Sequence, residues 1–399
     1  MMKHIIHIND KLSLSGGVEV YISQIQDLLR QRGWQSDWVA LVKNGSRLEI
    51  QSDNQELCWQ GEIRDLETTA LATLASVGKV VFHVHSLSEP ELLEVLFSLA
   101  PVVRTAHEPR MVCPGQGKFW AKQEQICQLP MGKHCFLHAY TKRCCNRHPK
   151  RLIKAYRNVM YEQNIASRQY ARVLANSHYT ENLLLDAGFS VEGVTHLPLF
   201  TRSMAAIDRT SVKSSQRILF VGRLSRTKGV HYLLRAMKMI HAALPHAELV
   251  LLGDGHDQYM FKQLTRELAL EDVVNFLGWV DRETVHAEIS KAAVIAFPSI
   301  YPEAFGISGI EAMVQGKPVV AFDVGGVSDW LRDGINGSLI PVKNTKAYAD
   351  ALIKILTDQE LADQYGAAGH EIAIKEFNED SHIKALSEIY EEVVLRRED

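Results

Sequence analysis

The chain has 399 residues, a length that fits two domains of average size better than a single core. Hydrophobic residues make up 46% of the sequence and charged residues 23%, which is the composition of an ordinary globular protein. The formal net charge of −3 argues against a general attraction to nucleic acid or to anionic lipid. No apolar run reaches the roughly 18 to 20 residues that cross a bilayer, and the first residues do not have the pattern of a signal peptide. We therefore expect a cytoplasmic protein.

Short apolar runs alternate with helical stretches along the chain, which predicts parallel sheets covered by helices. In the first half we expect strands at Ile5–Ile8, Trp38–Val42, Val80–His83, Val102–Thr105, Val173–Ala175 and Val194–Leu197. These runs are short and continuously apolar, as strands buried on both faces should be. A helix that ends near Gly33 is expected between the first two strands, because apolar residues recur there with helical spacing, at Val18, Ile22, Ile25 and Leu29.

The alternation lapses into polar sequence from Phe200 to Gln216, which predicts a linker. Further strands are expected at Ile218–Val221, Glu248–Leu252, Val274–Leu277, Val294–Phe297, Val319–Phe322 and Ser338–Ile340. Helices are expected to start near Gly229, Asp257, Arg282, Phe305 and Val327. A last amphipathic helix is expected from Asn378 to Arg397. We assign residues 1–200 to a first domain, 201–216 to the linker, 217–377 to a second domain and 378–399 to the terminal helix.

The first candidate motif, Leu14-Ser15-Gly16-Gly17-Val18, follows the first strand and opens the first helix. Adjacent glycines let backbone amides approach a phosphate or a sugar hydroxyl closely, and a helix N-terminus favours negative charge. A flexible turn explains the same residues equally well. The motif is not the Gly-x-Gly-x-x-Gly fingerprint of dinucleotide-binding enzymes, which disfavours a dehydrogenase.

The second motif runs from Phe220 to Gly229 and places Gly222, Arg223 and Lys228 between a strand and a helix. Two cations beside a helix N-terminus suit a diphosphate. The alternative is a solvated basic loop, which the strand–Gly–Arg–loop–Lys–Gly–helix order makes the less favoured interpretation.

The third motif, from Ser299 to Met313, places Glu303 in a loop and Glu311 about two turns inside the following helix. A carboxylate on this otherwise apolar helix surface is costly unless it is paired or bound to a ligand. Ionised carboxylates accept hydrogen bonds, so the two glutamates suit the hydroxyls of a ribose and a hexose. Either glutamate alone could be a solvated surface residue.

Together the three motifs resemble the retaining glycosyltransferases of family 4 in the GT-B superfamily, most strongly between residues 217 and 341. The resemblance implies two Rossmann-like α/β domains that face a cleft. It also implies that the first domain binds the acceptor, that the second binds a nucleotide sugar, and that the terminal helix packs back on the first domain.

Carried over to this sequence, the resemblance gives each motif a role. Arg223 and Lys228 neutralise the diphosphate, Glu311 holds the ribose, and Glu303 holds the transferred sugar. His107, in Arg104-Thr-Ala-His-Glu108, lies beside the reacting sugar. The implied catalytic set is His107, Arg223, Lys228 and Glu303. The implied donor-binding set is Gly16, Gly17, Gly222, Arg223, Lys228, Glu303, Phe305, Gly306, Ile307 and Glu311.

Some residues fit the resemblance less well. A lone histidine after a strand, such as His107, is more often a structural hydrogen-bonding group than a catalyst. His83 and His85 alternate along a strand, and we expect them to face opposite sides and not to form a metal pair. Asp329, in Gly325-Gly-Val-Ser-Asp, is one methylene shorter than the family's glutamate, although the segment should still close over the phosphates.

The sequence contains no Asp-x-Asp motif for a catalytic metal, so we expect Arg223, Lys228 and helix N-termini to meet the charge of the leaving diphosphate. The resemblance implies retention of configuration and a glycan or lipid-linked acceptor of polysaccharide biosynthesis. The spacing of the motifs does not report the base of the donor, and we expect a UDP-sugar in preference to GDP-mannose. The alternatives are an epimerase of the same fold and a non-catalytic subunit that binds a nucleotide sugar.

A cysteine-rich insertion is expected at about residues 113–148, and a basic stretch overlaps its end from Lys142 to Arg172. Crowded thiols in a cytosolic protein favour a metal over disulfides, so a structural zinc site is one hypothesis. Disulfides, an iron–sulfur centre or free thiols are the alternatives, since regular Cys-x₂-Cys pairs are missing. The five cysteines are Cys113, Cys127, Cys135, Cys144 and Cys145. The basic stretch could contact anionic lipid at the inner face of the membrane, or form a solvated helix face.

Overall fold

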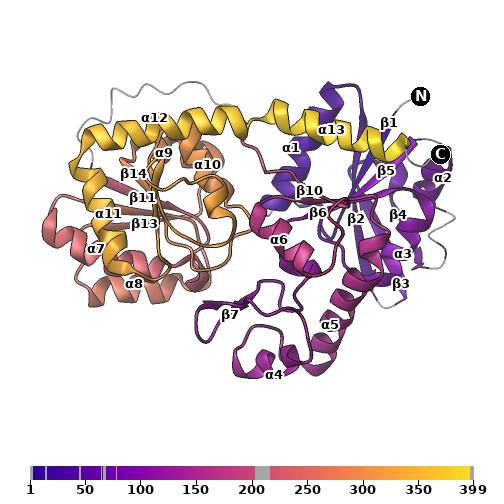
Figure 1. Ribbon diagram of the computed structural model, residues 1–399, viewed down its shortest axis with the longest axis horizontal. Coiled ribbons are helices and arrows are strands. Elements are labelled where there is room, and N and C mark those ends of the chain that lie inside the picture. Colours follow the sequence, from indigo (N-terminus) through magenta and orange to yellow (C-terminus); the bar gives the residue numbers. More distant parts are fainter. Residues whose placement is uncertain are drawn as a thin grey trace. The chain divides into compact units, whose positions relative to one another are not determined.

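The computed structural model describes residues 3–13, 16–44, 46–63, 65, 69–77, 79–202 and 216–395 (Figure 1). The chain forms two compact units. The first contains the residues up to Lys118, Cys127–Pro198 and the residues from Asp380, and the second contains Phe119–Ile126 and Leu199–Glu379. The linker predicted at 201–216 lies almost entirely outside the described residues, because 203–215 are not among them.

The first unit is built on an eight-stranded sheet in the order β10-β9-β6-β5-β1-β2-β3-β4. Its strands are β1 (Lys3–Asn9), β2 (Gln35–Asn44), β3 (Arg47–Ser52), β4 (Trp59–Glu62), β5 (Lys79–Val84), β6 (Val102–Ala106), β9 (Arg172–Ala175) and β10 (Val194–His196). Six of them are parallel, whereas β3 and β4 extend the sheet in antiparallel pairing. The connection between β2 and β3 is too short for a parallel crossover, which needs a dozen residues or more.

The first unit contains seven helices among its described residues, and the last of them comes from the final segment of the chain. They are α1 (Gly17–Gln31), α2 (Ala70–Val77), α3 (Pro90–Leu99), α4 (His134–Thr141), α5 (Pro149–Asn164), α6 (His178–Asp186) and α13 (Glu379–Leu395). Two buried hydrogen bonds fix α13 to this unit: Tyr390 Oη lies 2.6 Å from His83 Nδ1, and His382 Nε2 lies 2.9 Å from Tyr21 Oη. The prediction that the terminal helix packs on the first domain is therefore confirmed.

The second unit has a six-stranded parallel sheet in the order β13-β12-β11-β14-β15-β16. Its strands are β11 (Arg217–Val221), β12 (Glu248–Leu252), β13 (Val274–Gly278), β14 (Val294–Phe297), β15 (Val319–Phe322) and β16 (Gly337–Ile340). Its helices are α7 (Val230–Ala243), α8 (Gln258–Glu267), α9 (Arg282–Lys291), α10 (Ile307–Val314), α11 (Thr345–Thr357) and α12 (Gln359–Glu376). The strand order reverses between β11 and β14, and ligands of such sheets bind at this switch point.

All twelve predicted strands are present, but the helix predicted near Val327 is wrong. A 3₁₀ turn, η7 (Gly325–Asp329), takes its place. Gly325 has a φ of +55°, and a methyl group built on it would lie 2.2 Å from the carbonyl oxygen of Glu303. The backbone is therefore pressed against the preceding loop, and this contact sets the local conformation.

A two-stranded hairpin inside the predicted insertion belongs to the second unit, unlike the expected first domain of residues 1–200. It consists of β7 (Phe119–Trp120) and β8 (Gln125–Ile126). Glu124 in this hairpin accepts hydrogen bonds from Arg226, at 2.6 and 3.1 Å, and from Tyr232 Oη at 3.0 Å. An ion pair formed by residues about a hundred positions apart has no signature in the local sequence.

Candidate functional site

The loop between β11 and α7 lies at the switch point of the second sheet. It contains a 3₁₀ turn, η6 (Arg226–Lys228), and then Gly229, whose φ is +71°. A methyl group built on Gly229 would lie 1.7 Å from the carbonyl oxygen of Pro298. Ile300 N donates a hydrogen bond back to Thr227 O at 3.0 Å. The loop is therefore bound directly to the end of β14, which fixes the backbone that carries its cations. Arg223, in the same loop, is solvent-exposed.

Lys228 and Glu303 are in direct contact. Lys228 Nζ lies 2.6 Å from Glu303 Oε1, and the same carboxylate oxygen accepts a hydrogen bond from Ser299 Oγ at 2.5 Å. The side chain of Glu303 is only 12% exposed, whereas that of Lys228 is 32% exposed. An ammonium group has three donors and Glu303 uses one, so Lys228 keeps donors for an anionic ligand.

The backbone of Glu303 is held by the glycine pair at the start of η7. Gly326 N donates a hydrogen bond to Glu303 O at 2.7 Å. Because Gly325 packs against the same carbonyl, only a residue without Cβ fits there. The sequence had suggested that residues 325–329 close over phosphates; in the structure the pair supports the glutamate loop, and Asp329 lies half-buried in η7.

Glu311 lies on α10, the largely buried helix that follows this loop. Its side chain is 17% exposed, and its Oε1 lies 3.4 Å from Arg282 Nη2. Burial raises the pKa of Glu311, and the guanidinium of Arg282 opposes that rise. The helix packs so closely that a methyl group on Gly309 would lie 2.1 Å from the Trp330 ring.

Not every predicted donor-binding residue offers its side chain. Phe305 is 2% exposed and stacks edge-to-face with Phe377, so its side chain belongs to the core. The carbonyl oxygen of Phe305 accepts a hydrogen bond from Trp330 Nε1 at 2.7 Å. Any contact of Phe305 with a donor would therefore come from its backbone, and its place in the donor site stays a prediction. Gly306 and Ile307 are half-buried at the start of α10, with Gly306 at a φ of +97°. Gly222 is half-buried beside Gly253.

A pocket of about 250 Å³ in the second unit lies beside the cation loop. The hairpin contributes Phe119, Ala121 and Glu124 to its lining, and the loop contributes Ser225, Arg226 and Thr227. Sequence reasoning missed both Glu124 and Ser299. The only local signal for Ser299 is its position four residues before Glu303, and Glu124 becomes a neighbour of Arg226 only through tertiary folding.

The remaining predicted site residues belong to the first unit. Gly16 caps α1 in an extended conformation, and Gly17 begins the helix with open space where its Cβ would be. Leu14 and Ser15 lie outside the described residues. His107 follows β6, and its Nε2 lies 2.9 Å from His85 Nδ1.

His83 and His85 do not face opposite sides, and that prediction is wrong. Their ring centroids are 4.1 Å apart. Residues two apart in a strand share a face, so the two imidazoles lie together. Among the described residues, the donor atoms of His7, His83 and His85 also fall within 4.8 Å of one another.

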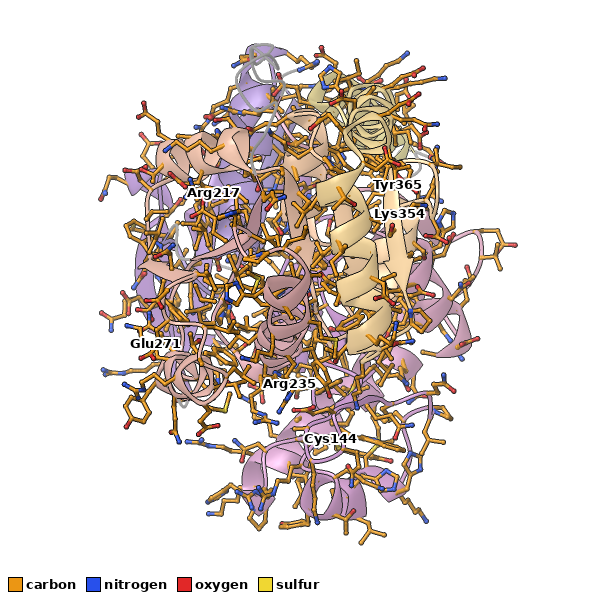
Figure 2. The ribbon with its side chains drawn as sticks, turned by 90° about the vertical axis from the view of Figure 1, so that its left-hand side faces the viewer. Cys144, Arg217, Arg235, Glu271, Lys354 and Tyr365 are labelled. Carbon is orange, nitrogen blue, oxygen red and sulfur yellow. The ribbon has the colours of Figure 1, made fainter. Side chains whose placement is uncertain are left out.

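Three of the five cysteines of the insertion lie around Pro114 and Gly115. Cys145 Sγ lies 3.2 Å from Pro114 O, and a methyl group on Gly115 would lie 3.7 Å from Cys113 Sγ and 2.0 Å from Cys144 O. Figure 2 labels Cys144 in this segment. Burial, and then the neighbouring thiols, raise the pKa of Cys144 to about 12. No three of the described cysteines have sulfur atoms all within 4.8 Å of one another.

Comparison with known proteins finds sequence similarity mainly in the second unit. Residues 207–372 match the family described as glycosyl transferases group 1. The chain is 36% identical over 159 residues to an uncharacterised glycosyltransferase of Methanocaldococcus jannaschii, covering 40% of this chain and 39% of the relative. It is 34% identical over 177 residues to the phosphatidyl-myo-inositol mannosyltransferase of Mycobacterium leprae, covering 44% and 46% of the two chains. The chain therefore spans less than half of the length of these relatives.

Solved structures match over nearly the whole chain. Anabaena HepE in complex with UDP has a TM-score of 0.66 at 18% identity, covering 97% of this chain and 99% of that one. Sucrose-phosphate synthase from Thermosynechococcus elongatus has a TM-score of 0.69 at 21% identity, covering 99% and 100%. The predicted GT-B fold, with two Rossmann-like units, is confirmed.

The contact between Gly229 and Pro298 predicts an unequal pair of alanine substitutions. Gly229→Ala and Gly278→Ala both place a side chain at a left-handed φ, +71° and +73°. That conformation costs about 1–2 kcal/mol in each case. Only Gly229→Ala also forces a methyl group onto a carbonyl oxygen, because nothing lies within 4 Å of a methyl group built on Gly278. Urea unfolding should show a clearly larger loss of stability for Gly229→Ala, and equal losses would contradict the packing argument.

Proposed function

We propose that this chain is a retaining glycosyltransferase that moves a hexose from a nucleotide-diphosphate sugar to a glycan or lipid-linked acceptor without a catalytic metal. The observation that carries the proposal is the contact between Lys228 and Glu303 at the switch point of the second sheet. It places a cation for phosphate and an acceptor for sugar hydroxyls side by side. The family match of residues 207–372 supports the same assignment.

Each side chain would bind one part of the donor. Arg223 and Lys228 would pair with the diphosphate, Arg223 through its planar fork of donors. Glu303, held by Ser299 and by the amide of Gly326, would accept hydrogen bonds from the transferred sugar. Glu311 would accept from the ribose hydroxyls and lose its contact with Arg282 when the donor enters. Its raised pKa favours binding where the carboxylate is ionised, above that pKa.

The chemical step leaves negative charge on the departing diphosphate. The sequence has no Asp-x-Asp motif, so in this proposal the charge is met by Arg223, Lys228 and the N-terminus of α7. No side chain is assigned as a nucleophile; the acceptor attacks from the face that the phosphate leaves, and the phosphate takes the acceptor's proton. His107 and the glycine pair Gly16-Gly17 would contribute from the first unit.

A UDP-sugar is the donor that we favour over GDP-mannose. Solved structures that share the fold include complexes of HepE with UDP and with UDP-glucose. An epimerase of the same fold, or a non-catalytic binding subunit, would bind the same nucleotide. Product analysis separates these functions, because only a transferase forms a glycoside.

Contact with an anionic membrane at its cytoplasmic face is the proposed role of α4 and α5. The solvent-exposed face of α5 carries Lys150, Ile153, Lys154, Arg157 and Met160 at helical spacing. On α4, Leu137 and Tyr140 are 63% and 51% exposed. Apolar side chains among cations are typical of helices that lie in a membrane interface. None of the described helices is long and apolar enough to span a membrane.

A structural zinc in the insertion is also proposed. The thiols that raise one another's pKa are neighbours, and zinc would stabilise the thiolates that burial disfavours. Four of the five sulfur atoms would have to draw together to coordinate it. The site would fix the loop and take no part in the reaction.

The donor proposal predicts stabilisation by one nucleotide class in the presence of EDTA. A ligand at about 100 times its dissociation constant should add roughly 2.7 kcal/mol, read as a rise in melting temperature across UDP-, GDP- and ADP-sugars. Glu311→Gln should abolish the shift, while Glu271→Gln, on the exposed surface, should keep it.

Arg223→Ala and Lys228→Ala should each lower turnover by about 10²–10³-fold. A loss below about threefold, or a shift that EDTA removes, would rule out this site.

The membrane proposal predicts that charge reversal on α5 weakens binding to anionic vesicles. Each basic residue near the surface contributes about 1 kcal/mol, so Lys150→Glu with Arg157→Glu should weaken co-sedimentation at least roughly 30-fold. The matched pair Arg235→Glu and Lys238→Glu, on exposed positions of α7, should have little effect. Equal binding to neutral vesicles, or an equal loss in the control, would refute the proposal.

The zinc proposal predicts about one zinc per chain in protein purified without chelator, measured by elemental analysis. Cys113→Ser should lose the metal and loosen the insertion, whereas Cys58→Ser, outside the insertion, should retain it. Less than about 0.2 zinc or iron per chain would exclude a stoichiometric site.

A further inference from the structure

Three neighbouring strands of the first sheet bring a row of imidazoles into the core. His7 lies on β1, His85 directly follows β5, and His107 directly follows β6, with β5 between the other two. His7 Nδ1 lies 3.2 Å from His85 Nε2, and His85 Nδ1 lies 2.9 Å from His107 Nε2. His7 and His85 are 0% and 2% exposed. The rings therefore form a chain of two nitrogen–nitrogen hydrogen bonds that ends at His107.

A metal site is the competing interpretation of this cluster, and His83 argues against it. The ring nitrogens of His7, His83 and His85 are close enough to share an ion. His83, however, uses both of its nitrogens, Nδ1 with Tyr390 Oη at 2.6 Å and Nε2 with Thr105 Oγ1 at 2.7 Å. An ion would have to break one of these buried bonds, whereas the hydrogen-bonded chain keeps both.

A chain of neutral imidazoles has only two proton arrangements, because each ring carries a single N–H. In the first, every ring is protonated on Nε2, and the buried Nε2–H of His7 has no acceptor among the described residues. In the second, every ring is protonated on Nδ1, and His7 Nε2 is a bare acceptor. Buried donors without partners are rarer than under-satisfied acceptors, so the second arrangement is favoured.

We infer that His85 and His7 are positioning residues that hold His107 as the neutral Nδ1–H tautomer, so that His107 offers a hydrogen-bond donor to the reacting sugar or its acceptor. The inference rests on the proposed function for the role of His107 and adds the residues that set its proton. In this arrangement His7 donates to His85, and His85 donates to His107 Nε2. His107 Nδ1–H is then directed away from the row of imidazoles.

The residues around His7, His85 and His107 keep these three imidazoles uncharged. Burial, together with the charges of Arg104 and Arg110, lowers the pKa of His107 to about 3. Burial, together with the charge of Arg30, lowers the pKa of His7 to about 3. Burial, together with the neighbouring histidines, also holds the pKa of His85 well below its usual range. Asp37 has the opposite influence on His7, but it is paired with His4 at 2.6 Å. Near neutral pH, His107 therefore acts as a neutral donor and not as an acid.

Nitrogen-15 NMR of histidine-labelled protein tests the inference directly, because the two ring nitrogens of each neutral tautomer have distinct shifts. We expect His7, His85 and His107 to be neutral and protonated on Nδ1 from pH 6 to 8. An Nε2–H tautomer at His107, a charged ring in the chain, or shifts of metal-bound nitrogens in purified protein would overturn it. This measurement uses the wild-type chain and needs no substrate.

Two substitutions at His85 supply a matched comparison. The asparagine amide reaches roughly the place of His85 Nδ1 and can still donate to His107, whereas the glutamine amide reaches the place of Nε2 and cannot. His85→Asn should therefore keep the His107 tautomer. His85→Gln should lose it and lower kcat by about 3- to 10-fold at an unchanged KM, as expected for one hydrogen bond. An unchanged His107 tautomer in His85→Gln would refute the inference. Failure of the donor panel would instead count against the proposed transferase.

Discussion

Backbone-to-backbone contact at the switch point of the second sheet is the constraint on which the candidate site depends. Gly229 touches the carbonyl of Pro298, and Gly325 touches that of Glu303. Neither contact leaves room for a Cβ atom, so the cation loop, the end of β14 and the glutamate loop form one rigid group. Lys228 and Glu303 meet at 2.6 Å because their main chains are fixed in this way. A diphosphate and a sugar could then be bound with little reorganisation, which is the condition for effective electrostatic stabilisation.

The first unit uses polar groups in its core, where a sheet of this kind is ordinarily apolar. A buried polar group is costly without a partner, and each histidine here has at least one. His83 joins β5 to β6 and α13 through Thr105 and Tyr390, and His382 joins α13 to α1 through Tyr21. The return of the terminal helix therefore completes the hydrogen bonding of the core. His85 and His7 extend the same network to His107, where structure and proposed chemistry meet.

The features that the sequence did not predict share one physical cause, which is contact between segments remote in the chain. Local patterns predicted the twelve core strands because buried parallel strands are short apolar runs, and they predicted Gly229 because a helix begins there after two cations. They did not predict that Gly325 would press on Glu303 where a helix was expected near Val327, or that the indole of Trp330 would donate to the carbonyl of Phe305. The hairpin with Glu124 joined the second unit for a similar reason, since its partner Arg226 is remote in sequence. The contact between His83 and His85 could have been predicted from the sequence, because residues two apart in a strand lie on the same face.

The sequence by itself determined the α/β class, the order of the strands along the chain and the amphipathic terminal helix. It also proposed Arg223, Lys228, Glu303 and Glu311 as a set of candidate site residues. These features are encoded locally, in hydrophobic period, glycine positions and the chemistry of side chains that follow strands. Only the tertiary structure decided which groups touch: Lys228 with Glu303, Arg282 with Glu311, Glu124 with Arg226, and the imidazole row that ends at His107. Such contacts depend on strand order and on close backbone approach, and neither is written in the spacing of residues along the chain.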